Sequence, residues 1–255
     1  MNSIHAEQGY LIPAINTNTV DYLSCAIGLA ESIKSWHPDA RISVLTPERC
    51  SHPAFDQVIP LPYGDFGGYA NDWQVFWASP YRQTIKLEAD MLATSPIDHW
   101  WTLFEHRDVV ISQGCRDFYD RHSGSRHYRK IFDENSLPDV YNAITYWRRS
   151  STAKTFFTMV KNIFENWDNW CTLLRFADRS PTTDVVYAMA ALIIGVEQVT
   201  IPAGFGPNII HMKRHIYGGH SEDWTKELIW ERQGSELSIQ TKRQWGFFHY
   251  HVKDW

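Results

Sequence analysis

Residues 9–45 read GYLIPAINTNTVDYLSCAIGLAESIKSWHPDARISVL, and this stretch decides the fold. The apolar run Gly9–Ile15 is typical of a buried strand, and the polar residues Asn16–Thr19 follow it. Apolar residues then recur at helical spacing from Val20 to Trp36. Arg41–Leu45 predicts a second strand. A strand, a helix and a strand in this order predict a βαβ unit with parallel strands and a right-handed crossover.

The rest of the chain continues this alternation. We expect a single α/β domain over residues 1–255, with a mostly parallel, Rossmann-like sheet flanked by helices and an irregular C-terminal third. The loops are expected at Leu61–Tyr69 and at Gly114–Pro138, a polar and mobile excursion. The expected strands are Thr84–Leu87, Arg107–Ser112 and Val140–Trp147, and the expected helices are Asp72–Ser79, Ser150–Asn166 and Asp184–Ile194.

The composition is that of an ordinary globular protein. Of the 255 residues, 44% are hydrophobic and 21% charged, which excludes a disordered chain. Aromatic residues reach 15%; most of them belong in a core, but their flat faces also suit stacking on sugars or bases. The net charge of −5 argues against a protein that binds DNA tightly through overall charge, although a local basic groove stays open.

The cysteines and the N-terminus bear on the compartment. Cys25, Cys50, Cys115 and Cys171 lie far apart without CxxC spacing, so we expect buried thiols rather than disulfides or a zinc site. We find neither a basic-then-apolar leader nor an apolar run of membrane-spanning length. The sequence therefore predicts a cytoplasmic protein of a bacterium or of a phage-infected host.

The central chemical motif is Glu88-Ala89-Asp90, directly after the expected strand Thr84–Leu87. Carboxylates at positions i and i+2 of a strand point to the same face. Beyond the strand end they can share one hard cation, which can bridge two phosphate oxygens. In open α/β sheets, ligands bind beyond the carboxyl ends of the strands, where this pair is expected. On its own the triplet is also compatible with a solvated turn.

Several further pieces occur in an order that resembles the glycogenin-type family of retaining glycosyltransferases, which have the GT-A fold. The stretch Ile15–Tyr22 is similar to the family's polar loop after the first strand, and Glu88-Ala89-Asp90 resembles its Asp-x-Asp motif. Asn142 in VYNAITYW, Asp184 in TTDVVYA and His211 in NIIHMK resemble three later positions of the family.

The resemblance implies a metal-dependent enzyme with residues 1–112 as the nucleotide-binding half and residues 113–255 as the acceptor half. Mn²⁺ or Mg²⁺ would neutralise the diphosphate leaving group of a nucleotide-sugar donor, a UDP-sugar above all. The metal ligands implied are Glu88, Asp90 and His211. The donor would be bound by Asn16, Asn18, Asp21 and Tyr22 and by Lys213 and Arg214, while Asn142 and Asp184 would orient the reacting sugar.

The chain also departs from the family. Its first acidic ligand is Glu instead of Asp, and Asp72 stands near the position of a basic family residue. The Gly and Lys that follow the family's metal-binding His are only loosely matched by Lys213, Arg214 and Gly218-Gly219. Each site residue also has a structural reading: His211 as a core histidine, Asp184 as a helix N-terminal acid, Asn142 as a strand-end hydrogen bonder and Tyr22 as a core residue.

The C-terminal stretch Trp245–Trp255 holds His249 and His251 at i, i+2. This spacing could indicate a second metal site. Because no Cys and no acid except Asp254 lies nearby, we favour an aromatic strand that lines the site.

The acceptor stays open between two chemistries and one alternative class of protein. Basic and aromatic residues interleave in Arg121–Lys130, and basic pairs occur at Arg148-Arg149 and Lys242-Arg243, which favours an anionic polymer such as phage DNA with hydroxymethylated bases. A bacterial glycan or lipopolysaccharide acceptor is the alternative. A non-catalytic nucleotide-sugar-binding module is the alternative from another class, whereas a nucleotidyltransferase would need a Gly-rich basic loop, which Ala14–Asn18 is not.

Overall fold

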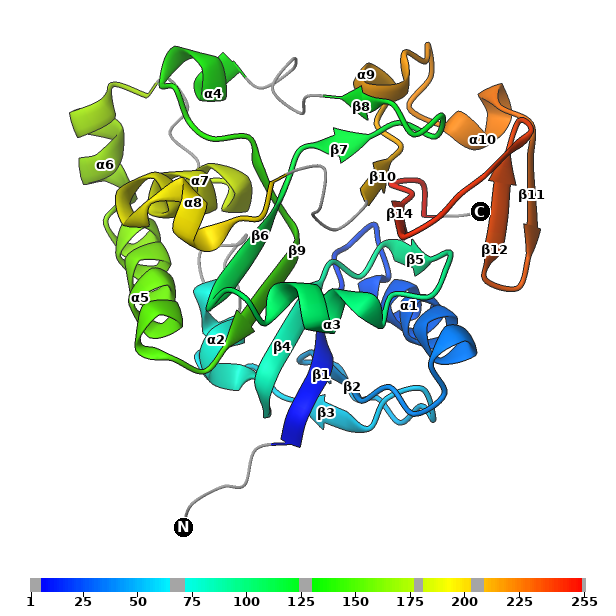
Figure 1. Ribbon diagram of the computed structural model, residues 1–255, viewed down its shortest axis with the longest axis horizontal. Helices are drawn as coiled ribbons and strands as arrows, with labels where there is room; N and C mark the ends of the chain where they lie inside the picture. Colours follow the sequence, from blue (N-terminus) through cyan, green and yellow to red (C-terminus); the bar gives the residue numbers. More distant parts are fainter. Residues whose placement is uncertain (1–5, 65–71, 124–129, 177–180, 203–208, 254–255) are drawn as a thin grey trace.

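A computed structural model gives the fold, and it describes residues 6–64, 72–123, 130–176, 181–202 and 209–253. A six-stranded sheet forms the centre, in the order β3-β2-β1-β4-β9-β6 (Figure 1). Strands β1 to β4 run parallel, and β9 is antiparallel to both of its neighbours. The bounds are β1 Ala6–Pro13, β2 Ile42–Leu45, β3 Gln57–Ile59, β4 Tyr81–Leu87, β6 Val109–Gln113 and β9 Val140–Arg148.

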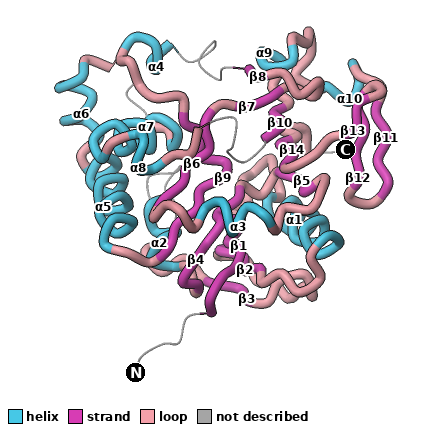
Figure 2. Tube along the Cα trace, viewed as in Figure 1, coloured by secondary structure: helices cyan, strands magenta, loops and turns pink. Residues whose placement is uncertain are grey.

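Helices cover the two faces of this sheet (Figure 2). Two separate hydrophobic cores result: Tyr10 and Ile12 of β1 belong to the core on the α1 side, whereas Leu11 between them belongs to the core on the α5 and α7 side. The bounds are α1 Tyr22–Trp36, α3 His99–Phe104, α5 Ser151–Glu165, α6 Trp167–Leu174, α7 Thr183–Ile194 and α8 Val196–Val199.

Side-chain caps fix where the long helices begin. The Asp21 carboxylate accepts a hydrogen bond from the Ser24 backbone N–H at the start of α1. The Ser150 and Thr182 hydroxyls do the same for α5 and α7. Such caps satisfy N–H groups that lack a partner within the helix.

A second sheet, in the order β5-β14-β10-β7-β8, packs against the α1 side of the central sheet. It is built from short strands: β5 Met91–Ala93, β7 Cys115–Arg116, β8 His122–Ser123, β10 Ile209–His211 and β14 Phe247–His249. Strand β5 follows β4 after the Glu88-Ala89-Asp90 turn, so this turn joins the two sheets.

The remaining elements are short. An antiparallel meander of β11 Trp230–Gln233, β12 Glu236–Ile239 and β13 Lys242–Arg243 lies beside the second sheet (Figure 1). The other short elements are η1 Asp72–Gln74, α2 Val75–Ala78, α4 Lys130–Glu134, α9 Arg214–Tyr217 and α10 Trp224–Glu227.

The α/β class and the parallel βαβ unit are confirmed by the pairing of β1 with β2. All four cysteines are free thiols, three of them buried and Cys50 half-buried. The expectation of a loop over Gly114–Pro138 is wrong for its described parts, because β7, β8 and α4 lie there; residues 124–129 and much of the Leu61–Tyr69 loop fall outside the described residues. Within the described ranges, no helix combines the length and the apolarity needed to cross a membrane.

Candidate metal and donor site

Glu88 and Asp90 lie in the turn that connects the two sheets. The Glu88 backbone N–H donates to the carbonyl oxygen of Ala143 in β9 at 3.1 Å, which ties the start of the turn to the central sheet. The Tyr250 N–H donates to the Asp90 carbonyl oxygen at 3.3 Å, which ties its end to the segment after β14. Both acids are therefore held by backbone contacts from elements far apart in the sequence.

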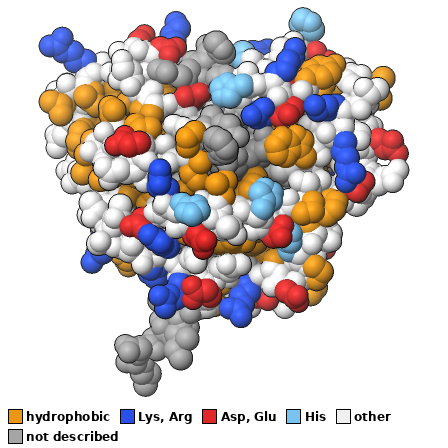
Figure 3. All heavy atoms as spheres, in the orientation of Figure 1, with side chains coloured by type: hydrophobic (Ala, Val, Ile, Leu, Met, Phe, Trp, Pro, Cys, Tyr) orange, Lys and Arg blue, Asp and Glu red, His pale blue; other side chains and the backbone are white. Residues whose placement is uncertain are grey.

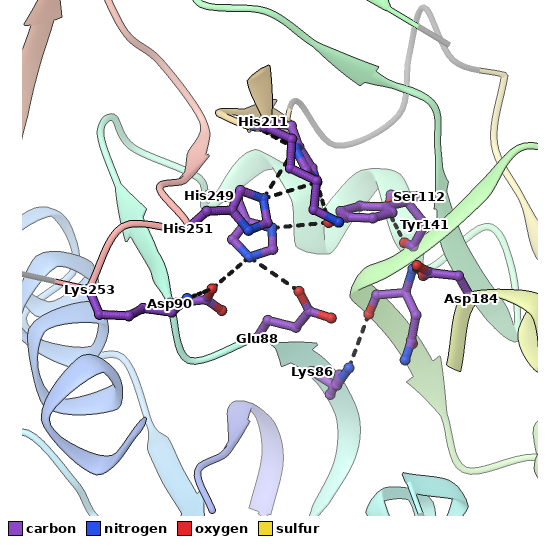
Figure 4. Close-up of polar contacts among 12 residues, drawn as sticks. Lys86, Glu88, Asp90, Ser112, Tyr141, Asp184, His211, His249, His251 and Lys253 are labelled. Carbon is purple, nitrogen blue, oxygen red and sulfur yellow. Dashed lines mark hydrogen bonds and ion pairs between the residues drawn. The ribbon is translucent and has the colours of Figure 1, made fainter. Parts of the chain in front are cut away.

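His249 reaches the two carboxylates because β14 pairs with β5. In this antiparallel ladder His249 stands opposite Met91, the residue directly after Asp90. Its Nε2 lies 3.0 Å from an Asp90 oxygen and 3.4 Å from a Glu88 oxygen (Figure 4). Each of the three side chains offers one potential ligand atom, and these atoms lie within 4.8 Å of one another.

The two carboxylates differ in their electrostatic surroundings. Burial raises the pKa of Asp90, but His249 and Lys253 outweigh it and hold the pKa well below its usual range. The Glu88 side chain is 30% exposed, and its partial burial is the largest influence and raises the pKa, although His249 and Lys86 partly oppose it. A bound cation would favour the ionised form of both acids.

These three residues fit a divalent metal ion in chemistry and in spacing. Two carboxylates and one imidazole suit Mn²⁺, and two carboxylates also suit Mg²⁺. Ligand atoms bound at about 2.1 Å and at right angles to each other lie about 3.0 Å apart. The observed separations of 3.0 and 3.4 Å from the His249 Nε2 are close to this value.

His211 lies on the far side of His249 from the carboxylates. Its Nε2 and the Tyr141 hydroxyl form a short hydrogen bond, and the same hydroxyl lies 3.3 Å from Nδ1 of His249. Its Nδ1 accepts a hydrogen bond from the Lys213 backbone N–H at 3.3 Å. Two groups of residues have ligand atoms close enough together to hold one metal ion, and we call each a metal-sized group. His211 belongs to one with His249 and His251, whereas Glu88 and Asp90 form the other with His249.

Asn142 and Asp184 meet at the start of β9. The Asp184 carboxylate, in the first turn of α7, accepts the Asn142 backbone N–H at 2.9 Å. The Asn142 side chain is fully buried and bonds to Thr145 at 2.8 Å and to Asp72 at 3.4 Å. Asp184 adds negative charge near Glu88, so these residues adjoin the carboxylate pair.

Beneath the pair lies a buried cation that the sequence analysis did not single out. Lys86 lies on β4, two residues before Glu88, and its side chain is only 4% exposed. Its ammonium donates to the Asn142 carbonyl oxygen at 3.1 Å and lies 4.0 Å from Asp72. The Tyr187 hydroxyl donates to Asp72 at 2.6 Å, so Asp72 is held by both α7 and β4.

The residues expected to bind the donor base gather at the start of α1. Asn16 accepts the Leu23 N–H at 2.9 Å, and Asp21 caps the helix, where hydrogen bonds from Ser24 lower its pKa. Asn18 is exposed, and Tyr22 lies under the ammonium of Lys253, 5.4 Å from it. A pocket of about 310 Å³ opens here, lined among others by Val20, Asp21, Met91, Arg232, Tyr250 and Lys253.

Lys213 and Arg214 lie at the other side of the histidine group. Lys213 is the N-cap residue of α9, and Arg214 forms an ion pair with Glu222 at 2.7 Å. Neither residue lines the pocket at the start of α1.

Two residues contact the carboxylate pair although the sequence did not place them there. His249 contacts Glu88 and Asp90, and Lys253 forms an ion pair with Asp90 and lines the pocket. The sequence carries the same pattern twice: two apolar residues, a His and a later Lys. It occurs in Ile209-Ile210-His211…Lys213 and again in Phe247-Phe248-His249…Lys253. Only the pairing of β14 with β5 distinguishes the two histidines.

Comparison with known proteins gives no match in sequence: no family model and no curated protein matches the chain. Solved structures do resemble it. The galactosyltransferase LgtC, solved with donor and acceptor sugar analogues, has a TM-score of 0.55 at 12% identity, over 95% of this chain and 86% of its own.

Two further structures are similar. Mouse xyloside xylosyltransferase 1 in its apo form gives a TM-score of 0.51 at 9% identity, over 96% of this chain and 97% of its own. The glycosyltransferase GlyE of Streptococcus pneumoniae TIGR4 gives 0.50 at 8% identity, over 84% of this chain and 48% of its own. At such identities the likeness establishes the fold, a mostly parallel α/β sheet of the GT-A type.

Proposed function

We propose that this protein is a metal-dependent glycosyltransferase that moves a sugar from a nucleotide-sugar donor, of the UDP type, to a hydroxyl acceptor. One observation carries the proposal: Glu88, Asp90 and His249 converge at the carboxyl end of β4, at metal-ligand spacing, in a fold whose similar solved structures are glycosyltransferases. Ligands of open α/β sheets bind at this edge.

In this proposal Glu88, Asp90 and His249 hold the divalent ion, Mn²⁺ or Mg²⁺. The bound ion supplies positive charge next to a diphosphate, which offsets the negative charge of that leaving group. His211, the ligand implied by the sequence resemblance, takes a supporting part, because its bond to Tyr141 fixes the hydroxyl that contacts His249. Partners of this kind orient a metal-binding imidazole.

The pocket at the start of α1 is the candidate donor site. Of the residues expected to bind the donor at this helix start, Asp21 lines the pocket, whereas Asn16, Asn18 and Tyr22 lie near it without lining it. Lys253 lies between this pocket and Asp90, where its ammonium suits a phosphate group. Lys213 and Arg214 would act from the opposite side of the histidines, with Arg214 leaving its pairing with Glu222.

Asp184 and Asn142 are proposed to position the donor sugar. Asp184 lies beside the carboxylate pair and is oriented by the Asn142 N–H. The Asn142 amide is engaged with Asp72 and Thr145, so its contribution is to hold the start of β9 in place.

For the acceptor, the ion pairs weigh toward a glycan rather than DNA. DNA carrying hydroxymethylated bases would need a continuous run of unpaired cations. In the described part of the basic stretches, which leaves out residues 124–129, Arg121 pairs with Asp117, Arg148 with Asp108, and Arg243 with Glu236. On the face drawn in Figure 3, the Lys and Arg side chains are dispersed among acidic ones.

A thermal-shift screen tests the donor site. Purified protein is heated with UDP, GDP or CDP, with and without Mn²⁺, beside Asp90→Asn and the surface control Glu134→Gln. At 100 times its dissociation constant a ligand adds about 2.7 kcal/mol to the free energy of unfolding, a readable rise in Tm. We expect stabilisation by UDP only with Mn²⁺, in the wild type and in Glu134→Gln but not in Asp90→Asn.

The screen also separates the proposal from its alternatives. Absence of a metal-dependent shift with every nucleotide contradicts the assignment of Glu88, Asp90 and His249. A clear shift without release of UDP from any UDP-sugar, with glycan or DNA acceptors added, favours a non-catalytic nucleotide-sugar-binding module.

A further inference from the structure

Three histidines meet on one face of the second sheet. His211 and His249 end the parallel strands β10 and β14 and stand directly opposite each other in the register. His251 follows two residues later, at a left-handed backbone angle (φ 58°) that is uncommon for a residue other than glycine. The cluster is therefore built by strand register plus one unusual backbone conformation.

The rings turn nitrogen atoms toward one another. Nε2 of His251 lies 3.2 Å from both ring nitrogens of His211. The ring centroid of His251 lies 4.3 Å from that of His211 and 4.0 Å from that of His249. One nitrogen of each residue lies within 4.8 Å of the other two. A nitrogen equally far from both nitrogens of a neighbouring ring does not have the direction of a single N–H···N hydrogen bond.

The spacing matches that of imidazoles around one ion. Two nitrogens bound to zinc at about 2.1 Å and at a tetrahedral angle lie about 3.4 Å apart. The 3.2 Å separations between His251 and His211 are close to this value. His211 and His249 are almost completely buried and His251 is half-buried, so the site is open to solvent only on the His251 side.

We propose that His211, His249 and His251 form a second metal site, which takes an imidazole-preferring ion of the Zn²⁺ and Co²⁺ class. Imidazole ligands suit these ions, whereas carboxylate ligands suit Mg²⁺ and Mn²⁺. The Tyr141 hydroxyl contacts Nε2 of His211 and Nδ1 of His249, so an ion bound through either of these nitrogens takes the place of that contact.

The second site goes beyond the proposed glycosyltransferase reaction and does not require it. His249 belongs to both metal-sized groups, so an ion among the histidines and an ion at Glu88 and Asp90 compete for the same ring. The two sites can be separated because Glu88 belongs only to one and His251 only to the other.

Zinc affinity, measured by competition with a chromogenic chelator, tests the proposal. The full chain is compared with His251→Gln, Glu88→Gln and the surface control His106→Gln. Loss of an outer partner of a metal ligand typically costs about 10- to 100-fold in affinity, so loss of a ligand should cost about 100-fold or more. We expect this loss in His251→Gln, and affinity close to that of the wild type in Glu88→Gln and His106→Gln.

Cobalt gives a readout that needs no variant. Co²⁺ among three imidazoles in a four-coordinate site absorbs visible light strongly, whereas Co²⁺ in a six-coordinate carboxylate site absorbs weakly. We expect the strong spectrum in the wild type. If His251→Gln does not fold, as judged by circular dichroism, His211→Asn takes its place in the zinc competition.

Three results overturn the proposal: no zinc binding by the wild type, a weak cobalt spectrum, or zinc binding that Glu88→Gln abolishes and His251→Gln retains. The last result puts the ion at the carboxylates and leaves the proposed glycosyltransferase function intact. Failure of UDP and Mn²⁺ to stabilise the protein would contradict the proposed glycosyltransferase function but not the histidine site, because zinc binding by the histidines does not depend on a nucleotide.

Discussion

In the metal-free protein, the surroundings of Glu88 destabilise the ionised form of its carboxyl group. Burial raises its pKa, and the charges of Asp90 and Asp184 add to the effect. In the unfolded chain this carboxyl ionises near its ordinary pKa of about 4.3. Between that value and the raised one the folded protein binds more protons than the unfolded chain, so its free energy of unfolding falls as the pH rises.

Glu88→Gln should therefore stabilise the metal-free protein. Its advantage in Tm over the wild type is expected to grow from about pH 4 upward and to become constant above the raised pKa. The measurement is thermal unfolding in EDTA across this pH range, with the exposed Glu134→Gln as control. An advantage that is independent of pH, or a destabilised variant at neutral pH, contradicts this account of Glu88.

Lys86 carries a buried charge, and its loss should lower the free energy of unfolding of the whole protein. Removal of one partner of a buried ion pair leaves the other charge without compensation, here Asp72. We expect Lys86→Met to lower the free energy of unfolding by about 3 kcal/mol or more. Urea denaturation measures the effect.

Two matched variants make the Lys86 result specific. Lys34 pairs with Asp56 at 3.1 Å near the surface, so Lys34→Met should cost only about 1 kcal/mol or less. Lys86→Met combined with Asp72→Asn should recover part of the stability, because no charge is then left buried alone. If Lys86→Met and Lys34→Met lower the free energy of unfolding equally, burial does not strengthen the effect of losing Lys86, and this account of the Lys86–Asp72 pair is contradicted.

The position of a residue in the fold could be predicted from the sequence where a strand carries the motif. Glu88 and Asp90 follow an apolar strand, so their place at its carboxyl end follows from the pattern. His249 could not be assigned in the same way, because its neighbourhood with Asp90 depends on β14 pairing with β5. That contact joins residues more than 150 positions apart, and no local pattern encodes it.

At the scale of elements, α5 anchors one face of the central sheet. Phe156 is fully buried there and contacts the rings of Phe157 and Tyr187, with centroids at 5.3 and 5.7 Å. Phe156→Ala should cost about 3–5 kcal/mol, because it removes buried apolar surface and leaves a cavity. Leu173→Ala, at a side chain that is 71% exposed, should stay within about 0.5 kcal/mol of the wild type.

Denaturant unfolding of both variants measures the difference. Similar free energies of unfolding for Phe156→Ala and Leu173→Ala would contradict the packing of α5 and α7 on β9. A specific loss in Phe156→Ala supports it.

Long elements were predictable and short ones were not. The helices α1, α5 and α7 begin at residues whose side chains cap them, and their apolar spacing extends over three or more turns. Strands such as β7 and β10 have only two or three residues, too few for an alternating pattern. The second sheet was therefore missed as a sheet, although Trp245–Trp255 was expected to contain a strand beside the site.

At the scale of the whole molecule, the candidate site is the seam between two sheets. Glu88 and Asp90 come from the end of the central sheet, and His249 comes from the second one. An ion held by all three would connect the two sheets directly. We therefore expect metal binding to need residues of both sheets.

The most direct test counts Mn²⁺ ions bound per chain by electron paramagnetic resonance in the presence of UDP. The account predicts one bound ion for the wild type and for the surface control His106→Gln, and about 100-fold weaker binding in both Glu88→Gln and His249→Gln. His211→Gln should lose less, since this residue supports His249 through Tyr141. Full Mn²⁺ binding by His249→Gln, with binding lost in His211→Gln, would contradict the account and return the ligand set to the one that the sequence resemblance implies.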